Sequence, residues 1–367
     1  MKILIDQNKL AEALSITVRT SSSSNIIQSL AGALLEAKDG KLTVSSQNIE
    51  TASKVVISDV EVINEGRTLV NAQYLTNFVS KLDNIQLILE VVDNKLVIKY
   101  GRSRGVVNIL SEEGWVDPIN LDEFSELFTV PAFTLQKALQ NTIFACAKTH
   151  FRQVFTGVLF DIEEESINFV GTNTHKLAIY NVDTFEVPPT EKRQLIVPLK
   201  NVTELLKVLS KIKTSVQVMI SKNTICFKSE EVVFTSQLLD GNFPNYRAVV
   251  PNSDHSIIVE TGILQGTLER VNLFPQKTVP VVQLTLQTED LKVYSASEES
   301  NQISEILPLK KGSEVEEKIS FNAQYLYEVT KFTGEDLHLG FTGGSAPVLI
   351  TGEDKSAKYI LVPLRAS

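Results

Sequence analysis

The chain repeats one sequence pattern at domain-sized intervals. Gly32–Glu36 reads Gly-Ala-Leu-Leu-Glu, and Gly157–Asp161 reads Gly-Val-Leu-Phe-Asp 125 positions later. Val70–Leu75, which contains Asn-Ala-Gln-Tyr-Leu after its first residue, recurs as Phe321–Leu326. Solenoid repeats have units of only roughly 20–50 residues, whereas domains cluster around ~100–150 residues. The 367 residues are therefore predicted to form three copies of one domain.

Each copy is predicted to contain a short strand, a helix, alternating strands, a second helix and closing strands. The first strands are expected at Lys2–Asp6, Leu127–Pro131 and Ser256–Glu260, and the first helices at Asn8–Thr17, Thr134–Lys148 and Gly262–Leu273. The second helices are expected at Ala72–Leu82, Leu199–Leu209 and Ala323–Phe332, and the last strands carry Leu110, Leu239 and Leu364 at comparable points. This pattern predicts an α+β fold, with the helices packed on one face of antiparallel sheet.

Two stretches interrupt the periodicity between copies. An Asp- and Glu-rich stretch precedes Ser125, and a Pro-Asn-Ser stretch precedes Asp254. Such stretches are typical of connections between structured segments. We therefore expect domains at residues 1–125, 126–252 and 253–367.

Positive charge is concentrated in two helical segments of an acidic chain. The net charge of −9 alone argues against nucleic-acid binding, because domains that bind nucleic acids are usually basic. However, Thr134–Arg152 and Leu199–Lys213 together carry +6, which leaves −15 for the rest of the chain. Lysine-bearing helix faces are common on soluble proteins, so a simple solvated face is one interpretation. The segregation favours the other, a surface turned toward a polyanion.

The helical period places these charges on defined faces. In Leu199–Ile212 an apolar face lies opposite Lys200, Lys207 and Lys211. In the preceding helix, Lys137, Asn141 and Lys148 are predicted to form a similar polar stripe.

The sequence argues against several other classes of protein. It contains no apolar run near the ~18 residues that a membrane helix needs and no recognisable secretory signal. Cys146 and Cys226 are interpreted as reduced core thiols of a cytoplasmic protein, since two cysteines make no disulfide framework. Phosphate-loop, nucleophile-elbow and metal-ligand patterns are not found. We therefore expect neither catalysis nor a cofactor or metal.

Further motifs along the chain point to a known family. They comprise Gly101–Arg104, Arg152 with Phe155–Gly157, Gly171–Ala178, Phe234–Tyr246, Phe321–Asn322 and Leu361–Arg365. In this order, on a threefold repeat, they resemble the bacterial sliding clamps, the β subunits of DNA polymerase III, over the whole length of the chain.

The resemblance implies a ring of two chains, joined head to tail, with domain one of each chain against domain three of the other. Helices would line a central hole around duplex DNA, bound independently of sequence, and sheets would lie outside. The ring would be a non-catalytic processivity factor that tethers the polymerase III α subunit, the clamp-loader δ subunit and repair proteins. DNA-facing residues would be Lys137, Lys148, Arg152, Lys200, Lys207 and Lys211, and the dimer interface would contain Leu273, Phe274, Val107 and Ile109.

The resemblance also implies a binding site for a Gln-Leu-x-Leu-Phe-like peptide of partner proteins, between domains two and three. Carried over residue by residue, this peptide site comprises Arg152, Phe155, Thr172, His175, Lys176, Leu177, Pro244, Val249, Asn322, Tyr325, Pro347, Val362, Pro363, Leu364 and Arg365. The chain departs from the family pattern at Asn173, Thr174 and Lys176, where lysine replaces the planar donor fork of arginine.

Other interpretations remain open at this point. A monomeric three-domain scaffold could bind peptides without encircling DNA. The chain could equally be a second clamp that confers resistance to a clamp-binding inhibitor. An enzyme using His175 is a further alternative, although a histidine at a hairpin tip is usually a solvated loop residue.

Overall fold

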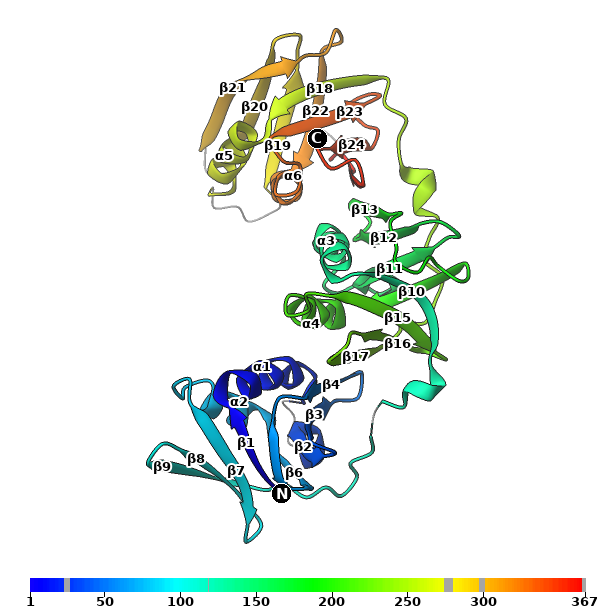
Figure 1. The fold of residues 1–367 in the computed structure, drawn as a ribbon. Helices are drawn as coiled ribbons and strands as arrows, with labels where there is room; N and C mark the ends of the chain where they lie inside the picture. Colours follow the sequence, from blue (N-terminus) through cyan, green and yellow to red (C-terminus); the bar gives the residue numbers. More distant parts are fainter. Residues whose placement is uncertain (23–26, 118, 274–279, 297–300, 365–367) are drawn as a thin grey trace. The chain divides into compact units, whose positions relative to one another are not determined.

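The protein folds into two compact units (Figure 1). The structure, a computed structural model, describes residues 1–22, 27–117, 119–273, 280–296 and 301–364. Unit 1 comprises Met1–Gln136, Thr184–Lys192 and Lys200–Leu238, and unit 2 comprises Lys137–Asp183, Arg193–Leu199 and Leu239–Ser367. The middle copy of the repeat thus contributes to both units.

Unit 1 contains the first copy of the repeat and half of the second. Its first-copy elements are β1 (Lys2–Asp6), α1 (Gln7–Thr17), β2 (Gly32–Lys38), β3 (Lys41–Gln47), β4 (Thr51–Ile57), β5 (Glu61–Asn64), β6 (Gly66–Asn71), α2 (Ala72–Val79), β7 (Gln86–Val92), β8 (Lys95–Tyr100) and β9 (Ser103–Asn108). Its second-copy elements are β10 (Ser125–Pro131), nearly all of α4 (Leu199–Leu209), β15 (Ser215–Ser221), β16 (Thr224–Lys228) and β17 (Val232–Gln237).

The strands of unit 1 form two antiparallel sheets. One has the order β5-β1-β7-β8-β9, and the other has the order β10-β15-β16-β17-β4-β3-β2-β6. The second sheet joins the two copies, because β17 of the middle copy pairs with β4 of the first. Helices α1 and α2 pack against each other, and α1 also contacts β3 and β4.

Unit 2 holds the other half of the middle copy and the whole third copy. Its middle-copy elements are the greater part of α3 (Ala132–Ile143), β11 (Gly157–Ile162), β12 (Ile167–Thr172), β13 (Lys176–Val182) and β14 (Arg193–Pro198). Its third-copy elements are β18 (His255–Glu260), α5 (Thr261–Asn272), β19 (Val281–Leu286), β20 (Asp290–Ala296), β21 (Gln302–Lys311), β22 (Glu317–Asn322), α6 (Ala323–Thr330), β23 (Asp336–Phe341), β24 (Val348–Thr351) and β25 (Ala357–Leu361).

One sheet of 12 strands runs through unit 2, in the order β14-β11-β12-β13-β25-β24-β23-β18-β21-β20-β19-β22. Again the two copies are joined by strand addition, since β13 of the middle copy pairs with β25 of the third. We call the β4–β17 pairing the first junction and the β13–β25 pairing the second junction.

Hydrogen bonds confirm the predicted equivalence of the three copies. The Leu110 amide donates to the Leu69 carbonyl, Leu239 to Ile196, and Leu364 to Ser320, at 2.8 Å in each case. The same period places a helix after each of Asn71 and Asn322, whose side chains accept hydrogen bonds from amides of the first helical turn. The strand-helix-strand order and the two helices per copy also follow the prediction.

The first helix of the middle copy is shorter than predicted. It was expected to reach Lys148, but α3 ends at Ile143. The reason lies in its close packing on β12, because a Cβ at Gly171 would stand 2.3 Å from the Thr142 carbonyl oxygen. After this contact the chain turns away, and Ala147 donates to the Phe155 carbonyl.

The polar stripe predicted for α3 is therefore wrong. Asn141 is only 7% exposed, and its side chain accepts a 2.6 Å hydrogen bond from the Tyr359 hydroxyl. Lys148 lies beyond the helix end, where it is exposed. The face of α4 follows the prediction, with Val202, Leu205 and Leu209 buried and the lysines exposed.

Candidate partner-peptide site and DNA-facing residues

The residues predicted to bind a partner peptide lie around the second junction, inside unit 2. The hairpin between β12 and β13 turns at Asn173, whose side-chain oxygen accepts hydrogen bonds from the His175 and Lys176 amides. Thr174 has φ 76°, which is a left-handed conformation. The Val362 amide then donates to the His175 carbonyl at 2.9 Å, so the segment after β25 lies directly beside this turn.

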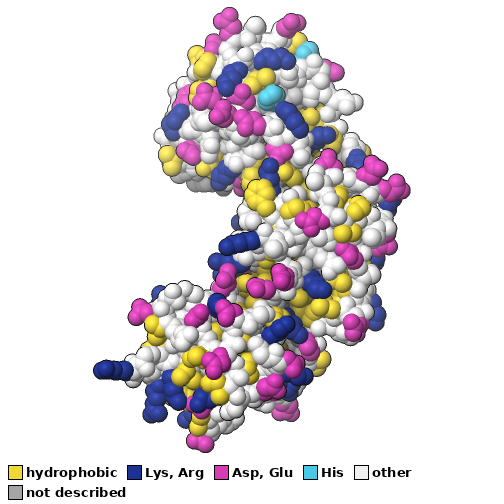
Figure 2. All heavy atoms as spheres, viewed as in Figure 1, with side chains coloured by type: hydrophobic (Ala, Val, Ile, Leu, Met, Phe, Trp, Pro, Cys, Tyr) yellow, Lys and Arg dark blue, Asp and Glu magenta, His cyan; other side chains and the backbone are white. Residues whose placement is uncertain are grey.

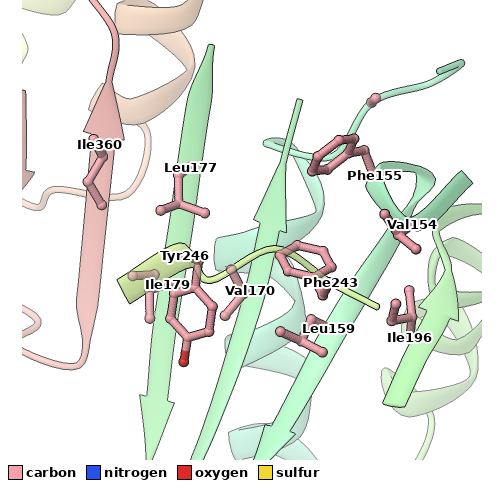
Figure 3. Close-up of a cluster of buried hydrophobic side chains, with 11 residues drawn as sticks. Val154, Phe155, Leu159, Val170, Leu177, Ile179, Ile196, Phe243, Tyr246 and Ile360 are labelled. Atoms are coloured by element: carbon pink, nitrogen blue, oxygen red, sulfur yellow. The ribbon is translucent and has the colours of Figure 1, made fainter. Parts of the chain in front are cut away.

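A buried apolar cluster lies next to the turn (Figure 3). It contains Phe155 and Leu177 of the predicted site, together with Leu159, Val170, Ile179, Ile196, Phe243, Tyr246 and Ile360. Phe243 and Tyr246 come from the connection between the second and third copies, which crosses β11 to β13 in the close-up. The cluster thus joins the sheet to that connection and forms a buried apolar base.

Several predicted residues form a partly exposed rim. Val249 is 50% exposed and Val362 is 42% exposed, and His175 is also exposed. Pro244, Pro347, Pro363 and Leu364 are half-buried. The Arg152 guanidinium lies 5.0 Å from the centre of the Phe155 ring. Arg365 lies outside the described residues. The rim therefore offers apolar surface with one cation at its side.

The lysine at the departure from the family pattern is buried rather than exposed. Lys176 is 6% exposed, and its ammonium pairs with Glu328 of α6. The same ammonium lies 4.6 Å from the Tyr325 ring centre and 5.4 Å from that of Phe144. Asn173 donates a hydrogen bond to the Tyr325 hydroxyl at 3.2 Å. Lys176 and Tyr325 therefore tie the middle copy to the third copy from below the rim.

Two other predicted site residues have structural duties. Thr172 is 9% exposed, and its hydroxyl donates to the Lys176 carbonyl at 2.8 Å. Asn322 accepts hydrogen bonds from the Gln324 and Tyr325 amides and so caps α6. Because both side chains are engaged, they hold the turn and the helix in place around the site.

The contacts around Lys176 also involve three residues that the sequence did not reveal: Phe144, Glu328 and Phe332. The Phe144 ring stacks on Phe332 at 5.0 Å between ring centres and contacts Tyr359 at 5.8 Å. The repeat could have pointed to Phe144, because this residue directly follows the first helix of the middle copy, on the side where the third copy packs. Its ring partners Phe332 and Tyr359 lie 188 (332 − 144) and 215 (359 − 144) positions away, so periodicity alone could not supply them.

The predicted DNA-facing residues are mostly exposed, but some are paired. In unit 2, Lys148 and Arg152 are exposed, whereas Lys137 forms a 2.6 Å ion pair with Asp354. The hydrogen bond to Asp354 raises the pKa of Lys137. In unit 1, Lys200 and Lys211 are exposed, and Lys207 pairs with Glu204 at 2.9 Å.

The described residues of the predicted interface lie on and just after β9 in unit 1 and at the end of α5 in unit 2. In unit 1, Val107 is 6% exposed and Ile109 is half-buried, whereas the neighbouring Val106 is 48% exposed. In unit 2, Leu273 is 79% exposed at the end of α5, and Phe274 lies outside the described residues. Figure 2 shows Lys and Arg side chains gathered where β8 and β9 lie.

The two thiols are buried in different units. Desolvation raises the pKa of Cys146, and also that of Cys226, to about 12. Both are free cysteines. Among the described residues, no cluster of metal-binding side chains is found, and none of the helices there combines the length and apolarity needed to span a bilayer.

Comparison with known proteins agrees with this architecture. Models of the DNA polymerase III beta subunit match the N-terminal domain at residues 1–116, the central domain at 129–245 and the C-terminal domain at 247–365. The chain belongs to the DNA polymerase III beta subunit family.

Full-length relatives extend this assignment. The clamp is 25% identical to the beta sliding clamp of Bacillus subtilis and 27% identical to that of Escherichia coli, with 100% of both chains covered in each case. The crystal structure of the Bacillus subtilis clamp matches with a TM-score of 0.92 over 100% of both chains. A Pseudomonas aeruginosa clamp bound to griselimycin has the same fold at 22% identity, also with a TM-score of 0.92 and 100% coverage of both chains.

The family defines the activity. The protein is a beta sliding clamp in DNA replication, a non-catalytic processivity factor of DNA polymerase III. Family membership implies DNA and polymerase as its partners. The interpretation of His175 as a catalytic residue is thereby set aside.

Proposed function

We infer that two chains of the clamp close head to tail into a ring, and that β9 of one chain pairs with β21 of the other. The observation that carries this inference is the identity of the two junctions within the chain. Both junctions join equivalent strands of neighbouring copies of the repeat. The equivalent strands that no junction within the chain uses are β9 in the first copy and β21 in the third.

The equivalent strands are found by counting through the paired strands of each copy. In each copy, the strand before the second helix (β6, β14 or β22) begins a run of three successive antiparallel pairings. Followed residue by residue from equivalent positions, these runs end at Ser53 of β4, Ala178 of β13 and Ile303 of β21, respectively. The path from β1, β10 or β18 leads likewise to Gly105 of β9, Phe234 of β17 and Tyr359 of β25. The three copies therefore present two matched sets of strands.

The two junctions have the same register. Ser53 is paired with Phe234 at the first junction, and Ala178 is paired with Tyr359 at the second. By the same rule, Ile303 of one chain should face Gly105 of the other chain in the ring. Within the described residues, β9 pairs only with β8, and the segment of β21 up to Pro308 pairs only with β20. Both edges thus have unpaired backbone groups, the usual template for strand addition.

A closed ring reconciles an acidic protein with a DNA partner. A ring is retained on duplex DNA by topology, so high affinity is not required and sliding can be fast. Exposed lysines such as Lys200 and Lys211 would supply weak, sequence-independent attraction to phosphates. The acidic remainder of the surface would discourage binding elsewhere.

The second junction supports the proposed peptide site. Its apolar base with Leu177 and its rim of Val249 and Val362 suit leucine and phenylalanine side chains of a short motif. Two such side chains supply about 1.5–3 kcal/mol each on burial. The ordering of a five-residue peptide offsets part of this, so micromolar affinity is expected. The polymerase α subunit and the clamp-loader δ subunit would attach here.

The ring is tested by topology. The clamp, loaded by its clamp loader on nicked circular DNA, should co-elute with the DNA in gel filtration and be released when the circle is linearised. A catenated protein behaves this way and a groove-binding monomer does not. Equal retention on circular and linear DNA, or a monomer at micromolar concentration in sedimentation velocity, would refute the ring and favour the monomeric scaffold.

A further inference from the structure

The inward-facing residues at the junctions differ in size in an ordered way. At both junctions within the chain, a small residue faces a large aromatic one: Ser53 faces Phe234, and Ala178 faces Tyr359. All four side chains are buried, since Ser53, Ala178 and Tyr359 are 0% exposed and Phe234 is 1% exposed. The two strands with a free edge among the described residues, β21 and β9, reverse this order, with isoleucine at 303 and glycine at 105.

A neighbouring aromatic ring occupies the space that a side chain at position 105 would need. A Cβ on Gly105 would stand 2.6 Å from the Cζ of Phe78, on helix α2. Counted from the helix starts, Phe78 corresponds to Leu205 in α4 and Val329 in α6, which are both aliphatic. The first copy thus has its aromatic ring on the helix and none on the strand, whereas the other copies have the opposite arrangement.

The ring of Phe78 is supported and remains partly accessible. It contacts Tyr100 edge-on at 5.9 Å and stacks with Tyr74 at 6.3 Å between ring centres. Tyr74 is 53% exposed. We call Tyr74, Phe78 and Tyr100 the aromatic cluster. It leaves an apolar surface over Gly105 at the free edge of the sheet.

The residues just after the first helix of each copy give an independent way to align the junctions. Thirteen positions after the residue that precedes each first helix stand Arg19, Phe144 and Leu273. At the second junction Phe144 packs against Tyr359 of the third copy. Because Tyr359 corresponds to Gly105, the equivalent contact brings Leu273, which is 79% exposed, onto the surface above Gly105.

We propose that this aromatic cluster with Gly105 is a size-selective seat for Ile303 and Leu273 of a second copy of the chain. The reversed order of sizes makes the seat specific. An isoleucine fits above a glycine beside Phe78, whereas an aromatic residue on β9 would leave too little space. Conversely, an alanine in place of Ile303 would leave the cluster uncovered. The seat would favour self-pairing over pairing with clamps whose sizes are not reversed.

The inference rests on the proposed ring, and a matched pair of variants tests it. Ile303 lies on the inward face of β21, and Ile306 lies on the outward face with 62% exposure. Ile303→Ala should raise the dimer dissociation constant at least about tenfold, since loss of a buried isoleucine side chain leaves a cavity. Ile306→Ala should change it less than about twofold, because surface substitutions are usually near neutral. Sedimentation velocity across a dilution series measures both.

A redesigned seat gives the converse test. Gly105→Phe combined with Phe78→Leu recreates the arrangement of the other copies. This double variant should be monomeric, because Phe at 105 leaves too little space for Ile303 of the second chain. Adding Ile303→Ala should restore the dimer. Thermal melting checks that both proteins fold; if the double variant does not fold, the comparison of Ile303→Ala with Ile306→Ala decides alone.

The outcomes separate the seat from the ring. A wild-type dimer whose dissociation constant is the same in Ile303→Ala and Ile306→Ala overturns the seat and leaves the ring standing. A folded Gly105→Phe/Phe78→Leu variant that dimerises like wild type also overturns it. A wild-type protein that stays monomeric at micromolar concentration overturns the ring itself.

Discussion

The two junctions of the clamp share a backbone but differ in their side chains. At the first, Asn48 accepts hydrogen bonds from the Glu50 and Thr51 amides, as Asn173 does from the equivalent amides at the second. The Gln237 amide donates to Glu50, as Val362 donates to His175. The turn, the register and the following strand segment are therefore the same.

The chemistry on this common frame is different. At the first junction, hydroxyl side chains hydrogen-bond beside the buried Phe234, with the oxygens of Thr20 and Ser53 2.7 Å apart. The second has a buried Lys176–Glu328 pair and stacked aromatic rings. Strand addition alone therefore does not create a peptide site. In the proposed peptide site, the apolar base and rim around the second turn supply what the first junction lacks, and they depend on a few side chains.

The largest expected effect is on peptide binding. Removal of residues 362–367 deletes the rim segment beside His175 and should abolish binding of a labelled Gln-Leu-x-Leu-Phe peptide in a fluorescence-anisotropy titration. Circular dichroism must show an intact fold. His175→Ala should weaken binding moderately, and Glu50→Ala, its equivalent at the first junction, should have no effect. Wild-type affinity in the folded truncation would place the peptide elsewhere.

Next in size is the packing of Phe144 against Phe332 and Tyr359. Phe144→Ala should lower the free energy of unfolding by about 2–3 kcal/mol, because the rings lose their stacking partner and a cavity remains. The matched variant is Arg19→Ala at the first junction, where Arg19 only approaches Glu204 at 3.9 Å. An exposed pair contributes about 0–1 kcal/mol. Urea denaturation compares them, and similar losses would remove the distinction between the junctions.

The buried ion pair should show coupling of a smaller size. Lys176→Met leaves the Glu328 carboxylate without its cation and should cost roughly 2 kcal/mol, less than a fully buried pair because Glu328 is 25% exposed. Glu328→Gln added to it should recover part of the loss. A double-mutant cycle in urea measures the coupling, and strict additivity would mean that the two groups do not interact.

The smallest effect concerns the thiols. With a pKa of about 12, Cys146 and Cys226 stay protonated in the folded protein up to pH 9, and thiolate is the reactive form. Ellman's reagent should therefore react only after denaturation. Phe144→Ala should speed the reaction of Cys146, which lies near the second junction, and leave Cys226 unchanged. Rapid reaction of the native wild type would contradict the burial of both thiols.

Much of this molecule could be predicted from its repeats, because period and spacing are local properties. The strands, the helices and the equivalence of Leu110, Leu239 and Leu364 follow from them. The end of α3 could not, since it depends on how closely Gly171 approaches Thr142. The burial of Asn141 depends on Tyr359, 218 positions away. Similarly, only packing shows that Lys176 is committed to Glu328 rather than available at the surface.

In the proposed ring, the edges of β9 and β21 that are free among the described residues make the clamp a bifunctional monomer in the sense of polymer chemistry. A molecule with one donor end and one acceptor end either cyclises or grows into an open chain. Cyclisation is favoured when the second bond forms within one complex, where the effective concentration of the ends is on the order of millimolar. At the far lower concentrations of dilute solution, two such monomers should close on themselves before a third can add.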